Sequence, residues 1–75
     1  MRLELLDEGT RTRVLRVVAG LSQHDLAARS GIDRRRISEH ELGQRTLPPA
    51  ALERVHGVLR SLNARSGAEA ADAVT

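Results

Sequence analysis

The fold of this chain is decided by residues 21–43, which read LSQHDLAARSGIDRRRISEHELG. This stretch indicates two short helices, about Gln23–Ser30 and about Arg34–Leu42, with a sharp bend between them. Gly31 lies at the bend, where a residue without a Cβ atom can adopt a positive φ. Gly43 follows the second helix, as glycine commonly does where a helix ends. Residues 21–43 are therefore predicted to form a compact helix pair.

The starts of the two helices carry signals of their own. Ser22 and Asp25 have the spacing of a capping box, and Asp33 is a good N-cap residue for the second helix. The first turn of that helix contains three consecutive arginines, Arg34 to Arg36. A helix pair whose second member begins in this way is typical of proteins that insert a helix into the major groove of DNA.

The residues before this pair predict a further helix and an N-terminal arm. Thr10 can cap a first helix that runs to about Ala19 and stops at Gly20. The apolar stripe of this helix comprises Val14, Leu15, Val17, Val18 and Leu21. It is wider than one core face needs, so we expect either the arm at residues 1–9 or a second subunit to cover the excess. The leucines of the arm fit either a short strand or a helical turn.

The residues after the pair predict a fourth helix and a tail. Pro49 suits the first turn of a helix over about Ala50–Leu62. The inner face of this helix is expected to be Leu52, Val55, Leu59 and Leu62. Residues 64–75 offer little to bury, so they are expected to be a disordered tail, with a frayed helix as the alternative. The predicted fold class is all-α, a compact bundle of four to five helices over residues 10–63.

Composition narrows the class of protein. With 75 residues the chain can form one small domain, and it has no Cys and no aromatic residue. Disulfides, thiolate metal sites and base stacking on aromatic side chains are thereby excluded. No apolar run approaches the roughly 18 residues of a membrane span, and no signal peptide is visible, so a cytoplasmic, nucleoid-associated protein without membrane contact is expected.

The basic residues are weak evidence for binding of nucleic acid. The net charge is only +2, but all 12 basic residues are Arg and none is Lys. Arginine suits phosphates and the edges of guanine, although a genomic bias toward Arg explains the preference equally well.

No pattern for catalysis or metal binding emerges. His24, His40 and His56 fall on three separate predicted helices, with no HxxxH pair and no nearby Cys. Ser, His and Asp are present, but no nucleophile elbow surrounds a serine. We expect no enzymatic activity, no cofactor and no metal. His40 is interpreted as a packing residue at the flank of the core and the other two histidines as surface residues.

A longer motif combines Ser22-Gln23, Leu26-Ala27, Gly31-Ile32 and the run ISEHELG at residues 37–43. Together with its flanking helices, over about residues 11–62, this motif resembles the Xre/Cro-type helix-turn-helix family of phage and bacterial repressors. The resemblance implies a lambda-repressor-like helical fold and dimeric binding of operator DNA. Thr12 and His40 depart from the family, because both occupy sites that are usually apolar.

The resemblance and helix geometry together predict the DNA contacts. Successive helix positions turn by about 100°, so the three arginines cannot all face one groove. If Ile37 and Glu41 point inward, the outward side carries Arg34, Arg35, Ser38 and Glu39. The residues expected to contact bases are Arg34, Arg35 and Glu39, through guanine O6 and N7 and through cytosine N4. The alternative for the arginines is a solvated basic face.

The same resemblance implies supporting roles for other residues. Phosphate contacts are expected from Gln23, Arg36, Ser38, Gln44, Arg45 and Thr46. For residues 44–46 an ordinary polar loop is the alternative. Arg16 and Glu41 are expected to form the partly buried structural ion pair of the family.

The predicted function is sequence-specific binding of double-stranded DNA at a palindromic operator, by a homodimer that acts as a transcriptional repressor. One alternative is the antitoxin of a toxin–antitoxin pair, which binds its toxin through the arm or tail and regulates its own operon. A restriction-modification controller is another. A third is transcription activation, in which His24 and Asp25 touch RNA polymerase.

Overall fold

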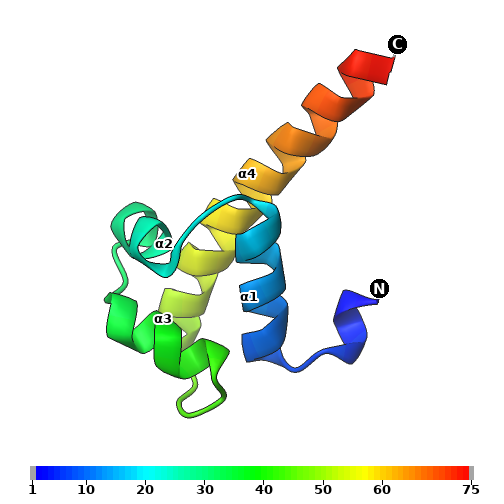
Figure 1. The fold of residues 1–75 in the computed structure, drawn as a ribbon. Coiled ribbons are helices and arrows are strands. Elements are labelled where there is room, and N and C mark those ends of the chain that lie inside the picture. The colour runs from blue at the N-terminus through cyan, green and yellow to red at the C-terminus, as the bar shows by residue number, and fades with distance from the viewer. Residues whose placement is uncertain (1, 75) are drawn as a thin grey trace.

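The computed structural model describes the backbone of residues 2–74 and the side chains of residues 2–64. Its elements are a 3-10 turn η1 (Leu3–Leu5) and the helices α1 (Glu8–Val18), α2 (Gln23–Ser30), α3 (Arg34–Glu41) and α4 (Pro49–Val74). α1 and α2 each pack against both α3 and α4, and α4 continues beyond the other helices (Figure 1). The described backbone contains no strand, which confirms the all-α prediction.

The core is built mainly from α2, α3 and α4. Leu26, Ile37, Val55 and Leu59 are almost completely buried, as their helical spacing predicts. Burial of an aliphatic side chain of this size contributes about 1.5–3 kcal/mol relative to exposure. The complete set of buried apolar residues is Leu26, Ile32, Ile37, Leu47, Ala51, Val55 and Leu59. These contacts hold α3 by one face, so its other face remains on the surface.

The turn between α2 and α3 forms as the sequence predicts. The Ser22 hydroxyl accepts from the Asp25 N–H at 3.0 Å, and the Asp25 carboxylate accepts from the Ser22 N–H at 3.1 Å. Donation by the Ser22 backbone and hydroxyl lowers the pKa of Asp25 below its ordinary value. Gly31 ends α2 with a φ of 73°. Asp33 is the N-cap residue of α3, as predicted, although its side chain makes no capping hydrogen bond.

The first helix begins earlier than predicted. Asp7, not Thr10, is its N-cap, and the Asp7 side chain accepts from the Thr10 N–H at 3.4 Å. Aspartate is the better capping residue of the two, and the earlier start brings Gly9 into the helix where it faces α3. α1 therefore includes two residues of the predicted arm. In the rest of the arm, Leu3–Leu5 form the η1 turn, and none of its described residues is in a strand.

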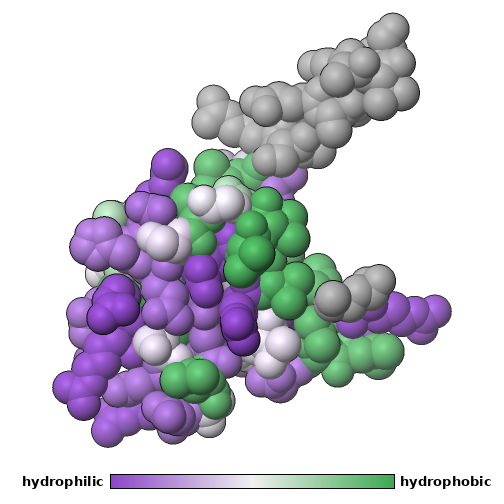
Figure 2. Space-filling view, in the orientation of Figure 1, coloured by the Kyte–Doolittle hydropathy of each residue, from purple (hydrophilic) through white to green (hydrophobic). Residues whose placement is uncertain are grey.

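The wide apolar stripe of α1 is left partly uncovered. Val17 and Val18 are 60% and 66% exposed, and Leu5 of the arm is itself strongly exposed. Figure 2 shows apolar side chains gathered over α1 and the N-terminal arm, whereas the side formed by α2 and α3 is mostly hydrophilic. The described residues of the arm therefore leave this part of the stripe uncovered.

The last helix differs from the prediction in length. The sequence predicts its end near Leu62, whereas α4 runs from Pro49 to Val74. Of the two alternatives for residues 64–75, the backbone has the helical one as far as Val74. On α4, Val55 and Leu59 are fully buried, but Leu52 and Leu62 are only half-buried. Ala51, which the sequence analysis did not assign to the core, is buried as well.

The two departures from the family pattern compensate each other. Thr12 of α1 and His40 of α3 are both buried, and Thr12 Oγ1 lies 3.0 Å from His40 Nε2. The Thr12 hydroxyl also donates to the Glu8 carbonyl oxygen at 3.0 Å. Because the hydroxyl has one proton, both bonds form together when His40 Nε2–H donates to Thr12. A hydrogen-bonded pair thus replaces an apolar contact, and neither polar group is buried without a partner.

This pair makes stability dependent on pH. Burial lowers the pKa of His40 below the ordinary value of 6.5; the nearby Glu8, Glu41 and Asp7 oppose the shift, and His56 adds to it. The unfolded chain therefore binds this proton at a higher pH than the folded chain. The contribution of His40 is fully present above about pH 6.5 and is lost as the pH falls below that value and through the folded pKa.

We expect chemical denaturation to show a decrease in the free energy of unfolding between about pH 7.5 and about pH 5.5. The double variant Thr12→Val/His40→Leu removes both polar groups and should show a smaller decrease. His24→Gln, at an exposed histidine, is the control and should retain the wild-type slope. Equal slopes in the double variant and the wild type would show that His40 does not titrate in this way.

Candidate nucleic-acid interface

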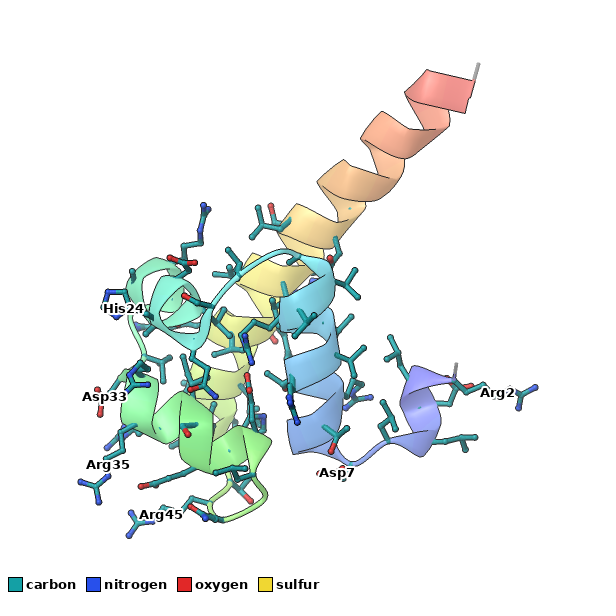
Figure 3. All side chains as sticks on the ribbon, in the orientation of Figure 1. Arg2, Asp7, His24, Asp33, Arg35 and Arg45 are labelled. Carbon is teal, nitrogen blue, oxygen red and sulfur yellow. The ribbon has the colours of Figure 1, made fainter. Side chains whose placement is uncertain are left out.

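The outward face of α3 begins with three exposed arginines, Arg34, Arg35 and Arg36. The helix exposes them because Ile37 and Glu41, one turn apart, are buried on its opposite side. Arg35 points away from the body of the protein, and Arg45, in the loop after α3, points to the same side (Figure 3). A short helix held by its inner face thus carries guanidinium groups on a protruding surface.

Glu39 lies between two of these arginines. Its carboxylate accepts from Arg35 Nε at 3.1 Å, one helical turn earlier, and pairs with Arg45 Nε at 3.5 Å. The side chains of Arg35 and Arg45 are 85% and 81% exposed, whereas that of Glu39 is only 19% exposed. Glu39 thus lies on the same side of α3 as Arg35, with which it pairs, but its side chain is much less exposed.

Behind α3, the expected pair of Arg16 and Glu41 is present. Arg16 Nε and Nη2 donate to the two carboxylate oxygens of Glu41 at 2.8 and 3.0 Å. Arg16 Nη1 donates to the Leu21 carbonyl oxygen at 2.8 Å. This arginine thereby joins α1, the linker before α2 and the end of α3. Such a bidentate pair fixes orientation as well as distance.

Gln23 belongs to the same network. Its side-chain amide donates to Glu41 Oε1 at 3.1 Å, so one end of this side chain is held on α3. The sequence predicts a phosphate contact at Gln23, but the bond to Glu41 was not anticipated. It joins residues 18 positions apart, and only the packing of α2 against α3 brings them together.

Two polar hollows flank α3. One is lined by Arg13, Arg16, Gln23, Ser38, Glu41 and Leu42. The other is lined by Arg36, Glu39, Arg45, Thr46, Leu47 and Pro48. Each hollow has two guanidinium groups against one carboxylate. Arg16 is engaged within the protein, so the guanidinium groups suited to phosphate oxygens are those of Arg13, Arg36 and Arg45. Of the predicted phosphate residues, only Gln44 lies outside both hollows, in the exposed loop after α3.

Among the arginines that line the two hollows, Arg13 is the one that the sequence does not predict. It is exposed on α1 and lines the same hollow as Gln23 and Ser38. No motif in the sequence indicates it, because its position beside α3 depends on how α1 packs. The only available signal is its spacing of three residues from Arg16, which places the two on neighbouring parts of one helix face.

The described part of the chain contains neither a metal-binding cluster nor a membrane-spanning helix. It contains no group of three or more His, Cys, Asp or Glu residues that could hold a metal ion. None of its helices is long and apolar enough to cross a membrane. His24 is exposed and His56 is half-buried on α4.

Comparison with known proteins agrees with this geometry. A family model described as Helix-turn-helix matches residues 13–62, two thirds of the chain. The protein thus belongs to the class of helix-turn-helix DNA-binding regulators of transcription, which is not a family of enzymes. Within that class it is a member of the Xre/Cro-like family. No curated protein and no solved structure was found to match the chain.

Proposed function

We propose that the protein is a homodimeric transcriptional repressor that reads a palindromic operator with α3 in the major groove. The observation that carries this proposal is the division of α3 into two faces. One face is locked into the core and onto Arg16, and the other carries Arg34 and Arg35 with exposed side chains. Repression is proposed because occupying an operator is the action that DNA binding alone supplies.

Base recognition is assigned to the first turn of α3. Arg34 and Arg35 are proposed to bind guanine O6 and N7, the acceptor pair that a guanidinium group contacts most often in the major groove. Glu39, which the sequence analysis also assigned to base contact, lies one turn later on the same side. The operator half-site is therefore expected to contain G·C pairs.

Phosphate contacts are assigned to the two hollows beside α3. Arg13, Gln23 and Ser38 would face one strand, and Arg36, Arg45 and Thr46 would face the other, with Gln44 beside them. An α-helix fills the major groove between two backbones, so a basic hollow on each side of α3 suits that geometry. These contacts would set register and affinity but not sequence preference.

Dimerisation is supported by the uncovered apolar surface of α1. Val17 and Val18 are exposed there and Leu5 is exposed on the N-terminal arm, and a second copy of the chain is the proposed cover. Two recognition helices related by a two-fold axis would lie about 34 Å apart, one turn of DNA. The mass of the purified complex, measured by sedimentation, distinguishes a homodimer from a complex with another protein such as a toxin.

Selection of bound duplexes from a random pool tests the function directly. The wild-type protein is expected to select two inverted half-sites that contain guanine. Affinity for the selected duplex should fall with salt at a log–log slope of about −0.9 per phosphate contact. A flat salt response without any preferred sequence would reject the proposal.

Arg35→Ala is expected to weaken binding to the selected duplex by about 5- to 150-fold, which corresponds to about 1–3 kcal/mol for one bidentate base contact. The free energy of unfolding should hardly change, because the Arg35 side chain is exposed. Arg60→Ala on α4 removes the same charge from another exposed ion pair and is the matched control. Equal losses in the two variants would mean that Arg35 acts only through charge.

A further inference from the structure

Glu39 is the one acidic residue on α3 that faces the proposed DNA surface and has two arginine partners. Each of its carboxylate oxygens engages a different arginine, Oε1 with Arg35 and Oε2 with Arg45. Arg35 belongs to the recognition helix, whereas Arg45 belongs to the loop that follows it. One carboxylate thus connects the proposed base-reading group to a proposed phosphate-contacting group.

We propose that Glu39 is a positioning residue that aims Arg35 at guanine and Arg45 at the DNA backbone, and that it does not itself read cytosine. This inference rests on the proposed function of α3. It changes the role that the sequence predicts for Glu39, from direct contact with a base to control of two residues that make contacts.

The atoms involved support this role. Both arginines approach Glu39 through Nε, and a guanidinium group has four further N–H donors on its terminal nitrogens. Those terminal groups remain available to a ligand in Arg35 and Arg45. Arg16 differs, because Nε, Nη1 and Nη2 are all engaged within the protein. The Glu39 pairs therefore orient the arginines without occupying the part of the fork that would meet a base or phosphate.

The backbone of Glu39 reinforces the connection. Its carbonyl oxygen accepts from the N–H groups of Gln44 and Arg45 at 2.8 and 3.3 Å. The loop that carries Arg45 is thus held to Glu39 through main chain and side chain together. The distance between a base contact at Arg35 and a phosphate contact at Arg45 then depends largely on this one residue.

The charges around Glu39 also support a positioning role. An uncompensated carboxylate on a DNA-facing surface would repel phosphates, but Glu39 lies between two cations. Exposed ion pairs of this kind contribute only about 0–1 kcal/mol to folding stability. Their value here lies in pre-organisation, because a long side chain that is already ordered loses less entropy when it binds. Glu39 should therefore matter much more for DNA discrimination than for the stability of the fold.

The test measures base preference and not affinity alone. Glu39→Ala is expected to reduce the preference for guanine at the position that depends on Arg35 by about 3- to 10-fold, the effect of releasing one ordered side chain. Its affinity for unrelated duplexes should stay equal or rise, because the formal net charge increases from +2 to +3. Glu39→Gln keeps the side-chain size and one acceptor and should show a smaller loss.

A second measurement separates positioning from direct reading. If Glu39 acts through Arg35, then adding Glu39→Ala to Arg35→Ala should not lower base preference any further. A loss of cytosine preference in Glu39→Ala, with guanine preference intact, would overturn the inference and restore Glu39 as a base reader. So would a further loss of base preference in the double variant.

Controls separate this inference from the function on which it rests. Glu53→Ala removes an acid from the exposed Glu53–Arg60 pair on α4 and should leave base preference unchanged. If Arg35→Ala loses guanine preference but Glu39→Ala does not, only the inference about Glu39 fails. If the wild-type protein shows no base preference, the proposed function fails and the inference fails with it.

Discussion

Arg16→Ala is expected to lower the free energy of unfolding by about 3–5 kcal/mol, because it leaves a buried carboxylate without its cation. The side chains of Arg16 and Glu41 are 12% and 2% exposed, so the Glu41 carboxylate has little access to solvent in the folded protein. Gln23 would remain as a neutral donor to Glu41. Small domains are stable by about 5–15 kcal/mol in total, so this loss would unfold a large fraction of the molecules on modest warming.

Denaturant titration of Arg16→Ala beside Arg60→Ala provides the measurement. Arg60 pairs with Glu53 at 3.2 Å, but both side chains of that pair are mostly exposed. Removing an exposed partner should cost no more than about 1 kcal/mol. If the two variants lose equal stability, the Arg16–Glu41 pair is more hydrated than its geometry indicates. If Arg35→Ala destabilises the fold more than Arg16→Ala, the structural and DNA-binding roles have been assigned the wrong way round.

Gly9→Ala is expected to destabilise the fold by about 1–3 kcal/mol, the usual cost of overpacking a tight contact. Gly9 lies in α1 against the end of α3, and an added Cβ would lie well inside van der Waals contact with the His40 carbonyl oxygen. The Glu41 carbonyl oxygen would be only 3.1 Å away. Both obstacles are backbone atoms, so relief requires α1 to move away from α3. That movement would also stretch the Thr12–His40 and Arg16–Glu41 contacts.

Gly57→Ala on α4 is the matched control, because an added Cβ there meets nothing within 4 Å. In a helix with free space, alanine is preferred to glycine by about 1 kcal/mol. The two variants should therefore change the midpoint of thermal unfolding in opposite directions. A stabilised Gly9→Ala variant would show that α1 and α3 can move apart at Gly9 at little cost.

Much of the fold follows from local signals, and these were predicted. The Ser22–Asp25 capping box and the positive φ of Gly31 depend on residues within one or two turns of each other. For the same reason the inward positions of Leu26 and Ile37 follow from helical spacing alone. A helix start is harder to predict where two nearby residues can both serve as the N-cap, as Asp7 and Thr10 can. The choice between them depends partly on how the helix packs against the rest of the protein.

In the candidate site too, some features follow from local spacing and others depend on tertiary packing. Exposure of Arg34 and Arg35 follows from their phase relative to Ile37 on one helix. The pair of Arg35 and Glu39 has the i, i+4 spacing of one helical turn, but the second partner, Arg45, could not be predicted in this way, because it reaches Glu39 only after the chain has turned at the end of α3. Arg13 could not be recognised either, since its position beside α3 depends on how α1 packs against that helix.

By itself, the order of residues specified a helical chain, a bent helix pair and an arginine-bearing recognition helix, because each of these arises from neighbours within about one turn. Tertiary packing alone decided that Thr12 pairs with His40, that Gly9 closes against α3 and that Glu39 holds arginines from two elements. The first two contacts join residues distant in sequence, and the third joins α3 to the loop that follows it. Their geometry depends on how whole helices pack against one another, and the local sequence pattern does not contain this information.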